Sequence, residues 1–525
     1  MKTARTTRMA FAGIIALAAS LTGDLRQAHA QAEDPSMVPG SKPDIIMVMA
    51  DDLRYDDLRV MPRTRELLGE QGTTFSTSLV SSPLCAPSRT GFFTGAMTHN
   101  HELGAGGSFV DVDLANSLPT WLRESGYYTS HVGKHINGYG LTTPLARTGS
   151  GDQWTGPTYV PPGYDDWFAL VDPSTNAYFD FLANNNGHLE HFPGPDHYKS
   201  DVLTEHAVRV IETQRDNPQP LFLTLAPNTP HDEAVWPLQQ EPLTEGIMTR
   251  DHPDPAPRHR GLFADEPLPA PPSFDEADAS SKPAEVRDRP RLSVEEIQTT
   301  TANNRARLAA LQALDENIAT IYDALHRTDR LDDTVFVFTA DNGWTLGEHR
   351  YSRTKTVHYE PSSRVPLLVR GPGFPAGTTR EQPVYNLDLT ATFVDLAAAV
   401  PTRPLDGWSL LPFAADASYG SQRVLGFELD TGRPAGANAP IRSLLGGDSS
   451  EPSTHYSAVR TRSWKYVLHT DTGEEELYHL AEDPDELHNL ALDAAYVREK
   501  NALKREQDAM TTCVGITCRR IVELP

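Results

Sequence analysis

Acidic and amide side chains follow two apolar segments that lie far apart in the sequence. Asp51 and Asp52 come directly after the segment 44–50, and Asp341 and Asn342 come directly after the segment 335–340. One Asp pair after a strand is usually part of a turn or a helix cap, but two such sets on separate strands favour a shared site. Converging carboxylates would repel one another without a cation, and these oxygen ligands suit Ca2+ or Mg2+ better than zinc.

Two further apolar segments end in side chains that can bind an anion or transfer a proton. Lys134 follows the segment 127–132, and His231 comes soon after the segment 221–226. In open α/β sheets, ligands bind beyond the carboxyl ends of the strands. The sequence therefore predicts that acids, an amide, a histidine and a lysine from four strands meet at one edge of a sheet.

The three cysteines comprise one pair close together in the sequence and one single residue. Cys513 and Cys518 lie close together near the end of the chain and are expected to pair. Cys85 is left single in the run CAPSR at 85–89. The proline and serine of this run can open a helix, which would place Cys85 near the positive end of the helix dipole, with Arg89 one turn further on. A lone cysteine is most often a small buried apolar residue, but this local string favours a functional one.

The elements that would position these side chains alternate between strands and helices. Nearly continuous apolar runs, typical of strands covered on both faces, lie at 44–50, 127–132, 221–226, 335–340 and 365–370. Helices are predicted at 117–126 and, from leucine and isoleucine at three- and four-residue steps, at 308–325. This order predicts an α/β fold with a large, mostly parallel central sheet flanked by helices.

The character of the sequence changes along the second half of the chain. Residues 232–290 are dense in Pro, Asp and Glu without clear periodicity, and we interpret them as a long excursion or lid within a catalytic domain at 42–400. Residues 457–469 indicate one or two strands and residues 476–480 another. A smaller antiparallel subdomain is therefore predicted at 401–525.

The first thirty residues have the plan of an export signal. A basic stretch precedes an apolar run of about fifteen residues, and small residues then allow cleavage after Ala30. A membrane anchor is the less favoured alternative, because a bilayer needs roughly 20 apolar residues. We expect residues 1–30 to be a signal peptide and the mature protein to be secreted or periplasmic, with no membrane insertion.

Composition excludes some classes of partner. Acidic residues outnumber basic ones by 71 to 46, for a net charge of -25, which argues against nucleic-acid binding and against affinity for anionic membranes. Hydrophobic residues make up 38% of the chain, enough for a large core.

Together these elements resemble the type I sulfatase family, within the alkaline-phosphatase-like superfamily. The run at 85–89 matches the family's C-x-P-S-R element, where an enzyme converts the cysteine to Cα-formylglycine, so a formylglycine-generating enzyme is an expected partner. The other matching elements, in the family's order, are Asp51-Asp52, Gly133-Lys134, His231, Asp341-Asn342-Gly343, Gly347-Glu348-His349, Lys355, Arg364-Val365-Pro366-Leu367 and Glu476-Leu477-Tyr478-His479-Leu480. The resemblance covers roughly residues 42 to 495.

The resemblance implies a cation site and a modified nucleophile. One divalent cation, calcium as a rule and magnesium as the alternative, would be bound by Asp51, Asp52, Asp341 and Asn342, with modified Cys85 as a further ligand. The implied reaction is hydrolysis of a sulfate monoester. One hydroxyl of the hydrated aldehyde attacks sulfur, and the other then drives the release of sulfate.

The resemblance also implies roles for five basic residues. Arg89 would stabilise the hydrated aldehyde, while Lys134 and Lys355 would hold the sulfate oxygens. His231 would assist the departure of the alcohol. His349 would line the pocket.

One position departs from the family pattern. Many sulfatases have a G-K-W-H element, but Ile136 stands two residues after Lys134 here, and His135 is one residue off. We do not assign the family histidine's role to His135. The form G-K-x-x-N-x-Y resembles the branch that includes N-acetylglucosamine-6-sulfatases, which points to a sugar sulfate as substrate, with an aryl sulfate as the alternative.

Two other functions are open at this point. A phosphonate or phosphate ester hydrolase of the same superfamily would have nearly the same residues. A non-catalytic protein that binds sulfated glycans on a decayed enzyme scaffold would lack a key residue, and only the histidine of the G-K-W-H element is missing here.

Overall fold

The apolar segment Asp44–Ala50 forms β1, a buried strand in the middle of a sheet that has ten strands within the described part of the chain. The computed structural model describes residues 42–104, 107–140, 156–235, 248–429 and 455–524. In order across the sheet, the strands are β13 (Thr378–Arg380), β2 (Thr73–Phe75), β12 (Leu367–Arg370), β11 (Thr334–Ala340), β1, β8 (Leu221–Ala226), β4 (Tyr128–Gly133), β5 (Asp166–Leu170), β6 (Phe181–Asn185) and β7 (His188–Phe192). All except β12 and β6 run in the same direction, so the predicted mostly parallel sheet is confirmed.

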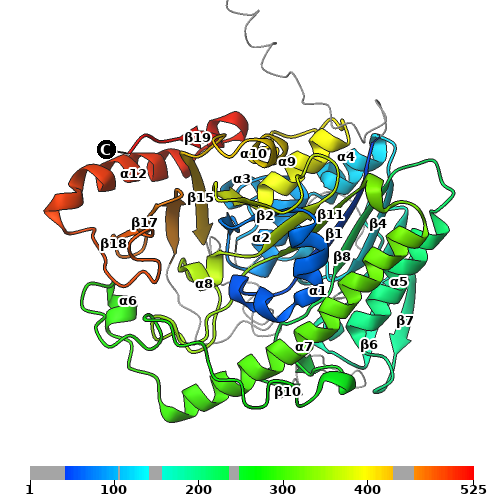
Figure 1. Ribbon diagram of the computed structural model, residues 1–525, viewed down its shortest axis with the longest axis horizontal. Coiled ribbons are helices and arrows are strands. Elements are labelled where there is room, and N and C mark those ends of the chain that lie inside the picture. The colour runs from blue at the N-terminus through cyan, green and yellow to red at the C-terminus, as the bar shows by residue number, and fades with distance from the viewer. Residues whose placement is uncertain (1–41, 105–106, 141–155, 236–247, 430–454, 525) are drawn as a thin grey trace, which may run out of the picture. The chain divides into compact units, whose positions relative to one another are not determined.

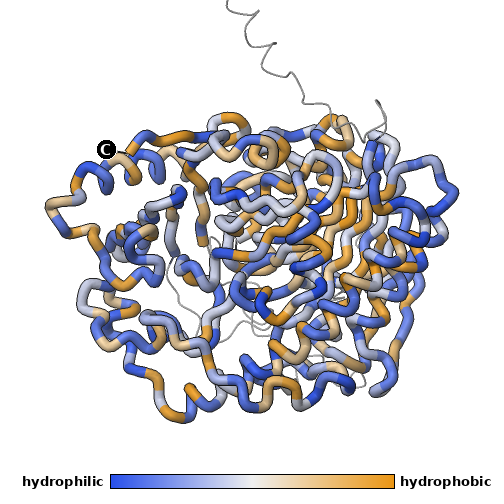
Figure 2. The backbone as a smooth tube through the Cα atoms, viewed as in Figure 1, coloured by the Kyte–Doolittle hydropathy of each residue, from blue (hydrophilic) through white to orange (hydrophobic). Residues whose placement is uncertain are grey.

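Alternate residues of β1 enter two hydrophobic cores, one on each face of the sheet. Ile45 and Met47 belong to one core, and Ile46 and Val48 belong to the other. The first core includes residues of α2 (Cys85–Thr94), α4 (Leu118–Glu124) and α9 (Asn386–Leu396), and the second includes residues of α5 (Lys199–Thr213) and α7 (Val294–Arg327). Figure 1 shows α5 and α7 side by side on one side of the sheet, and Figure 2 shows strongly hydrophobic strands beneath the helices. Burial on both faces explains the continuous apolar runs in the sequence.

The segments predicted as strands of this sheet are strands, and one predicted helix is much longer than expected. The helix predicted at 308–325 begins at Val294 instead. Its start is a capping box, in which the Ser293 hydroxyl accepts from the Glu296 amide at 3.2 Å and Glu296 accepts from the Ser293 amide at 2.7 Å. The first turns are mostly exposed and polar, so apolar periodicity alone does not reveal them.

The helix that carries Cys85 also begins earlier than predicted. Its proline and serine suggest a start at residues 87 and 88, whereas α2 begins at Cys85 and Leu84 is its extended N-cap. Asn386 of α9 fixes this segment, because it accepts from the Ser81 amide at 2.9 Å and donates to the Ser88 carbonyl at 2.9 Å. Cys85 is therefore at the first position of a buried helix, where the helix dipole is positive.

The predicted excursion contains little regular structure among its described residues. Within 232–290 these form β9 (Ala234–Val235), β10 (Met248–Thr249), a short turn of 3-10 helix at Pro257–His259 and α6 (Ala284–Arg287). Residues 236–247 and the predicted signal peptide at 1–30 lie outside the described residues. None of the helices described is both long and apolar enough to cross a membrane.

A second, antiparallel sheet follows the first in the sequence, as predicted. Its strands are, in order, β18 (Glu475–His479), β17 (Trp464–His469), β16 (Tyr456–Arg460), β15 (Arg423–Leu429) and β19 (Arg520–Ile521), and α12 (Val497–Met510) packs against it. The expected disulfide between Cys513 and Cys518 is present. Apart from turns of 3-10 and π-helix, the other short elements among the described residues are α1 (Pro62–Thr64), α3 (Thr98–His101), α8 (Glu360–Ser363), α10 (Leu411–Ala415), β3 (Ser78–Leu79) and β14 (Val384–Tyr385). The division into domains at 42–400 and 401–525 remains a proposal.

A buried ion pair joins the antiparallel sheet to α9, a helix that packs on the ten-stranded sheet. Arg423 of β15 donates to both carboxylate oxygens of Asp388 of α9, at 2.6 and 2.7 Å, and both side chains are almost completely buried. Asp388 also accepts from the amides of Tyr385 and Trp408. Removing this carboxylate would leave a buried guanidinium without its partner.

We therefore expect Asp388→Ala to lower the free energy of unfolding by about 3–5 kcal/mol. The measurement is urea unfolding followed by fluorescence. Asp395→Ala is the matched control, because Asp395 lies on the same helix and is exposed; it should change stability by less than about 0.5 kcal/mol. Equal effects of the two substitutions would contradict this prediction.

Candidate active site

The predicted site residues lie at the carboxyl ends of four adjacent parallel strands. In the sheet these strands are neighbours in the order β11, β1, β8 and β4. Asp341 and Asn342 follow β11, Asp51 and Asp52 follow β1, and Lys134 follows β4. His231 comes five residues after the end of β8. The edge predicted from the sequence is therefore the edge at which these residues meet.

Hydrogen bonds join the pair Asp51-Asp52 to the pair Asp341-Asn342. The Asp52 amide donates to Asp341 Oδ1 at 3.1 Å, and Asn342 Nδ2 donates to Asp52 Oδ1 at 2.7 Å. Asp51, Asp52, Asp341 and Asn342 are all completely buried. Residues separated by 289 positions thus form one polar cluster.

Three oxygen atoms of this cluster accept no hydrogen bond from the described residues. They are Asp51 Oδ1, Asp52 Oδ2 and Asn342 Oδ1. Buried oxygens without a partner are costly, and a hard cation bound by carboxylate and amide oxygens removes that cost. The donor set fits Ca2+ or Mg2+, and Asp341 could contribute an oxygen as well, because a carboxylate oxygen has two lone pairs.

Cys85 is next to this cluster. It is the free cysteine of the described chain and is buried. Lys355 Nζ lies 3.8 Å from Cys85 Sγ and 2.6 Å from Asp52 Oδ1. Lys355 thereby links the thiol to the acidic cluster, although 270 positions separate it from Cys85 in the sequence.

Arg89 and Lys134 complete the group of buried cations. Arg89 Nε donates to Asp341 Oδ2 at 2.7 Å, and Arg89 Nη1 donates to the Lys134 carbonyl at 2.8 Å. Lys134 Nζ lies 2.6 Å from Asp51 Oδ2. Gly133, directly before Lys134, allows the end of β4 to pack closely against β8, because it has a φ of +110° and an added Cβ would come within 2.3 Å of the Ala226 carbonyl oxygen.

The electrostatics of the site reflect crowding of three carboxylates. Burial by itself would raise the pKa of Asp51, but the ammonium of Lys134 brings it below its ordinary value. Burial, with the charge of Asp51, raises the pKa of Asp341 to about 6. Burial opposes the charge on Lys355, yet Asp52 raises the pKa of that ammonium well above its usual range. Three buried carboxylates thus lie close together, and each contacts a cationic side chain.

His231 is held as a neutral ring. Its Nδ1 donates to the Asp232 carbonyl at 2.7 Å, and its Nε2 lies 3.7 Å from Asp52 Oδ2. Burial lowers the pKa of His231 to about 4, although Asp52 and Asp51 act in the opposite direction. The Nε2 atom therefore faces the cluster, where it could exchange a proton with a bound group.

Arg307 is a site residue that the sequence does not single out. It is fully buried on α7 and donates to the Pro230 carbonyl at 3.1 Å and to the Asp52 carbonyl. These contacts hold the segment after β1 beside the segment after β8. A charged residue directly before Leu308, on the apolar face of a helix, is the signal that could have identified it.

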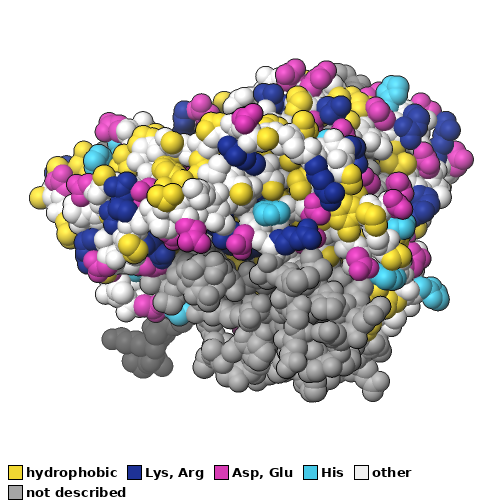
Figure 3. Space-filling view, turned by 90° about the horizontal axis from the view of Figure 1, so that it is seen from below, with side chains coloured by type: hydrophobic (Ala, Val, Ile, Leu, Met, Phe, Trp, Pro, Cys, Tyr) yellow, Lys and Arg dark blue, Asp and Glu magenta, His cyan; other side chains and the backbone are white. Residues whose placement is uncertain are grey.

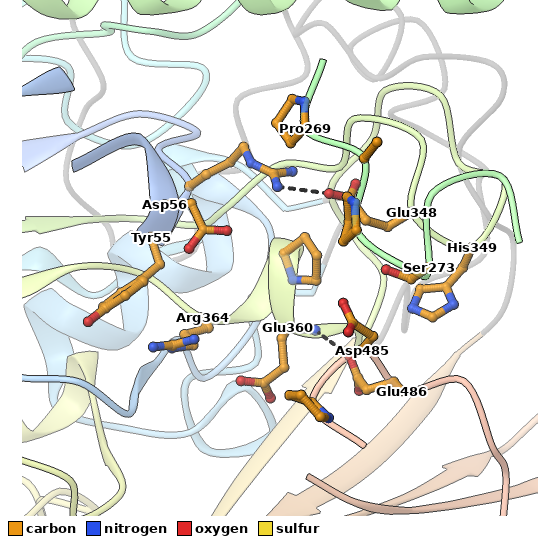
Figure 4. A pocket seen from close by; sticks show the side chains of 15 residues that line it. Tyr55, Asp56, Pro269, Ser273, Glu348, His349, Glu360, Arg364, Asp485 and Glu486 are labelled. Atoms are coloured by element: carbon orange, nitrogen blue, oxygen red, sulfur yellow. Dashed lines mark hydrogen bonds and ion pairs between the residues drawn. The ribbon is translucent and has the colours of Figure 1, made fainter. Parts of the chain in front are cut away.

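His349 lies apart from this cluster. Its ring stacks on Tyr359, with the ring centres 3.7 Å apart, and it lines a separate cavity of about 380 Å3. Figure 4 shows His349 and Ser273 on the side of this cavity away from Tyr55 and Arg364. The lining does not include Cys85 or the acidic cluster. A catalytic role for His349 stays a prediction without a contact to Cys85 among the described residues.

His135 also lies outside the acidic cluster. Its ring stacks on Phe93, with the ring centres 4.4 Å apart, and contacts the rings of His131 and Trp167. Burial lowers the pKa of His135 well below its ordinary value, so the ring is neutral. This packing agrees with leaving the family histidine's role unassigned at this position.

The part of the chain that carries these residues matches a known family in sequence. A family model described as sulfatase matches residues 43–399. The chain belongs to the sulfatase family. This sulfatase is a sulfuric ester hydrolase, and the resemblance inferred from its motifs is confirmed.

Relatives and solved structures agree with this assignment. An arylsulfatase of Volvox carteri is 30% identical over 529 residues, covering 91% of this chain and 76% of the relative. An N-acetylglucosamine-6-sulfatase of Homo sapiens is 27% identical, covering 91% of this chain and 86% of the relative. The structure of BT4656 in complex with its substrate D-glucosamine-2-N,6-O-disulfate superposes with a TM-score of 0.69 at 21% identity, covering 89% of this chain and 97% of that one. This structural likeness confirms the alkaline-phosphatase-like fold.

Proposed function

We propose that this sulfatase hydrolyses a sulfate monoester with a formylglycine made from Cys85 and with one bound divalent cation, Ca2+ or else Mg2+. The observation that carries the proposal is the set of three unpartnered oxygens of Asp51, Asp52 and Asn342, beside a buried free cysteine. The cation would be held by these residues and Asp341. When bound, it supplies positive charge against the anionic ester. The hydrate of the aldehyde supplies a hydroxyl nucleophile that a plain thiol lacks.

The basic side chains of the site would bind and orient the ester. Lys134 and Lys355 are paired with Asp51 and Asp52, and a cation on those carboxylates would leave both ammonium groups free to bind sulfate oxygens. Arg89 lies between Asp341 and the Lys134 carbonyl, where it would orient residue 85 and its hydroxyls. His231 Nε2, which is unprotonated in the neutral ring, would take up a proton and then donate it to the oxygen of the departing alcohol. Burial restricts these four side chains before substrate arrives, because all are almost completely enclosed by the protein.

The proposed substrates are sugar sulfates or aryl sulfates of modest size. Relatives named N-acetylglucosamine-6-sulfatase and arylsulfatase support both classes. On the face seen in Figure 3, acidic and basic side chains are interspersed over the described surface. With a net charge of -25, such a surface favours small or terminal sulfates over long polyanions.

Maturation and location are part of the same proposal. Cys85 would be converted by a formylglycine-generating enzyme, which recognises the CAPSR run. The N-terminal sequence supports cleavage after Ala30 and a secreted or periplasmic enzyme.

The proposal is tested by comparing different transferred groups on one leaving alcohol, 4-nitrophenol. We expect kcat/KM for 4-nitrophenyl sulfate to exceed that for 4-nitrophenyl phosphate and for a 4-nitrophenyl phosphonate by at least about tenfold, or 1.4 kcal/mol. N-acetylglucosamine-6-sulfate should release sulfate in the same preparation. The protein is produced together with a formylglycine-generating enzyme, and a Cys85→Ala preparation gives the blank. A preference for the phosphonate would instead assign a phosphonate hydrolase.

A further inference from the structure

Lys355 is carried by a long segment without regular structure. The segment 341–359 joins β11 to α8 and contains no helix or strand. Near Lys355, the Thr356 amide donates to the Pro83 carbonyl at 2.9 Å, and Thr356 has a φ of +71°. This left-handed conformation is costly for a β-branched residue unless the surroundings impose it. Besides the contact of Lys355 with Asp52, contacts further along the segment can therefore stabilise this conformation.

Glu476 of β18 makes such contacts with His358 and Tyr359, two and three positions after Thr356. Its Oε1 accepts from His358 Nε2 at 2.8 Å and from His469 Nε2 at 2.6 Å. Its Oε2 accepts from the hydroxyl of Tyr359 at 3.1 Å and from that of Tyr478. Glu476 is completely buried, so these four donors take the place of water around the carboxylate.

A second contact joins the same segment to the antiparallel sheet. Lys465 of β17 donates to the His358 carbonyl at 3.0 Å and lies 2.8 Å from Glu360 and 2.7 Å from Glu486. Lys465 is completely buried. Residues 358–360 are thus attached to the second sheet through side chains and backbone, three to five positions after Lys355.

We propose that Glu476 is a positioning residue for Lys355. By fixing His358 and Tyr359, Glu476 sets where the Lys355 ammonium lies relative to Cys85 and Asp52, and so couples the antiparallel sheet to the reaction. This inference rests on the role of Lys355 in the proposed function. Glu476 itself contacts neither Cys85 nor the acidic cluster among the described contacts.

Hydrogen bonding explains this cluster better than a metal ion does. The two histidines and the carboxylate lie close enough together to hold one. However, separations of 2.6 and 2.8 Å between ring nitrogen and carboxylate oxygen are direct hydrogen-bond lengths. The hydroxyls of Tyr359 and Tyr478 also occupy the other oxygen.

The test is a double-mutant cycle between Glu476→Gln and Lys355→Ala. In protein with intact Lys355, Glu476→Gln should lower kcat/KM for 4-nitrophenyl sulfate by about 10-fold or more, because Gln keeps the shape but replaces one of the two acceptor oxygens with an NH2 donor. In the Lys355→Ala background the same change should cost less than about twofold. Glu482→Gln is the matched control, since Glu482 lies in the turn after β18 with its side chain 74% exposed; it should have no effect in either background.

A second readout does not depend on turnover. Hydrogen exchange of the Thr356 amide should be at least about tenfold faster in Glu476→Gln and unchanged in Glu482→Gln. If Glu476→Gln does not fold, Tyr359→Phe removes one of the four hydrogen bonds and should show the same two effects to a smaller degree.

The outcomes separate the two proposals. An equal loss of kcat/KM in both backgrounds, or unchanged exchange at Thr356, would overturn the positioning role of Glu476. So would a stoichiometric metal that is lost in Glu476→Gln, because the cluster would then be a metal site. Full activity of Lys355→Ala would overturn the role of Lys355 in the proposed function, while the exchange measurement would still report on the segment.

Discussion

Cys85→Ala is expected to abolish sulfatase turnover, with a loss in kcat of at least about 10,000-fold, or about 5 kcal/mol. The helix α2 begins at residue 85, so alanine fits the position without disturbing the buried helix. The lysines and the other cation ligands would stay in place, and the substrate would still bind. What is lost is the nucleophile, and with it the covalent route that divides the reaction into two steps. A steady-state assay with 4-nitrophenyl sulfate measures the effect.

The same prediction has a chemical readout in the unmutated protein. Mass spectrometry of the peptide that contains Cys85 should find an aldehyde, and activity should scale with the aldehyde fraction across preparations. The matched control is the double variant Cys513→Ser and Cys518→Ser, which removes the other two cysteines and should keep turnover within about twofold. A fully active preparation that carries a free thiol at residue 85 would refute the formylglycine assignment.

The sequence predicts the strands that carry these residues because each strand is marked locally. Apolar runs mark the buried strands, and the residue that follows each run is at the sheet edge, as for Asp51 after β1 and Asp341 after β11. The parallel order of these strands then brings the residues together. By contrast, the contacts of Arg307 appear only when α7 is placed against the segments after β1 and β8.

Contacts between distant segments are what the sequence could not provide. His358 and Glu476 are 118 positions apart. The local sequence indicates a loop around His358 and a strand around Glu476, and nothing in either stretch indicates that the two side chains meet. Their hydrogen bond depends on how the second sheet packs against the first. His349 is a similar case, because its motif suggested the pocket of Cys85, whereas its ring stacks on Tyr359 in another cavity. Motif order fixes neighbours along the chain but not the direction of a side chain.

Asp341→Asn is expected to remove the bound cation and to lower kcat/KM by about 1,000-fold. The substitution keeps the shape of the side chain but removes one of three buried carboxylates that share the site. Elemental analysis should find about one Ca2+ or Mg2+ per chain in the unmutated protein and almost none in the variant. Asp332→Asn is the control, because Asp332 precedes the same strand and its side chain is fully exposed.

Thermal unfolding separates loss of the cation from loss of the fold. After chelation, adding Ca2+ at about 100 times its dissociation constant should stabilise the unmutated protein by about 2.7 kcal/mol. Asp341→Asn should show almost no such increase, while Asp332→Asn should show all of it. The reason is that the oxygens of Asp51, Asp52 and Asn342 that accept no hydrogen bond are satisfied only when the cation binds. The Asp341 carboxylate adds a further negative charge that attracts the cation. If Asp341→Asn kept the metal and the Ca2+-induced stabilisation, Asp341 would not belong to the cation site. That result would also contradict a cation bound beside Cys85.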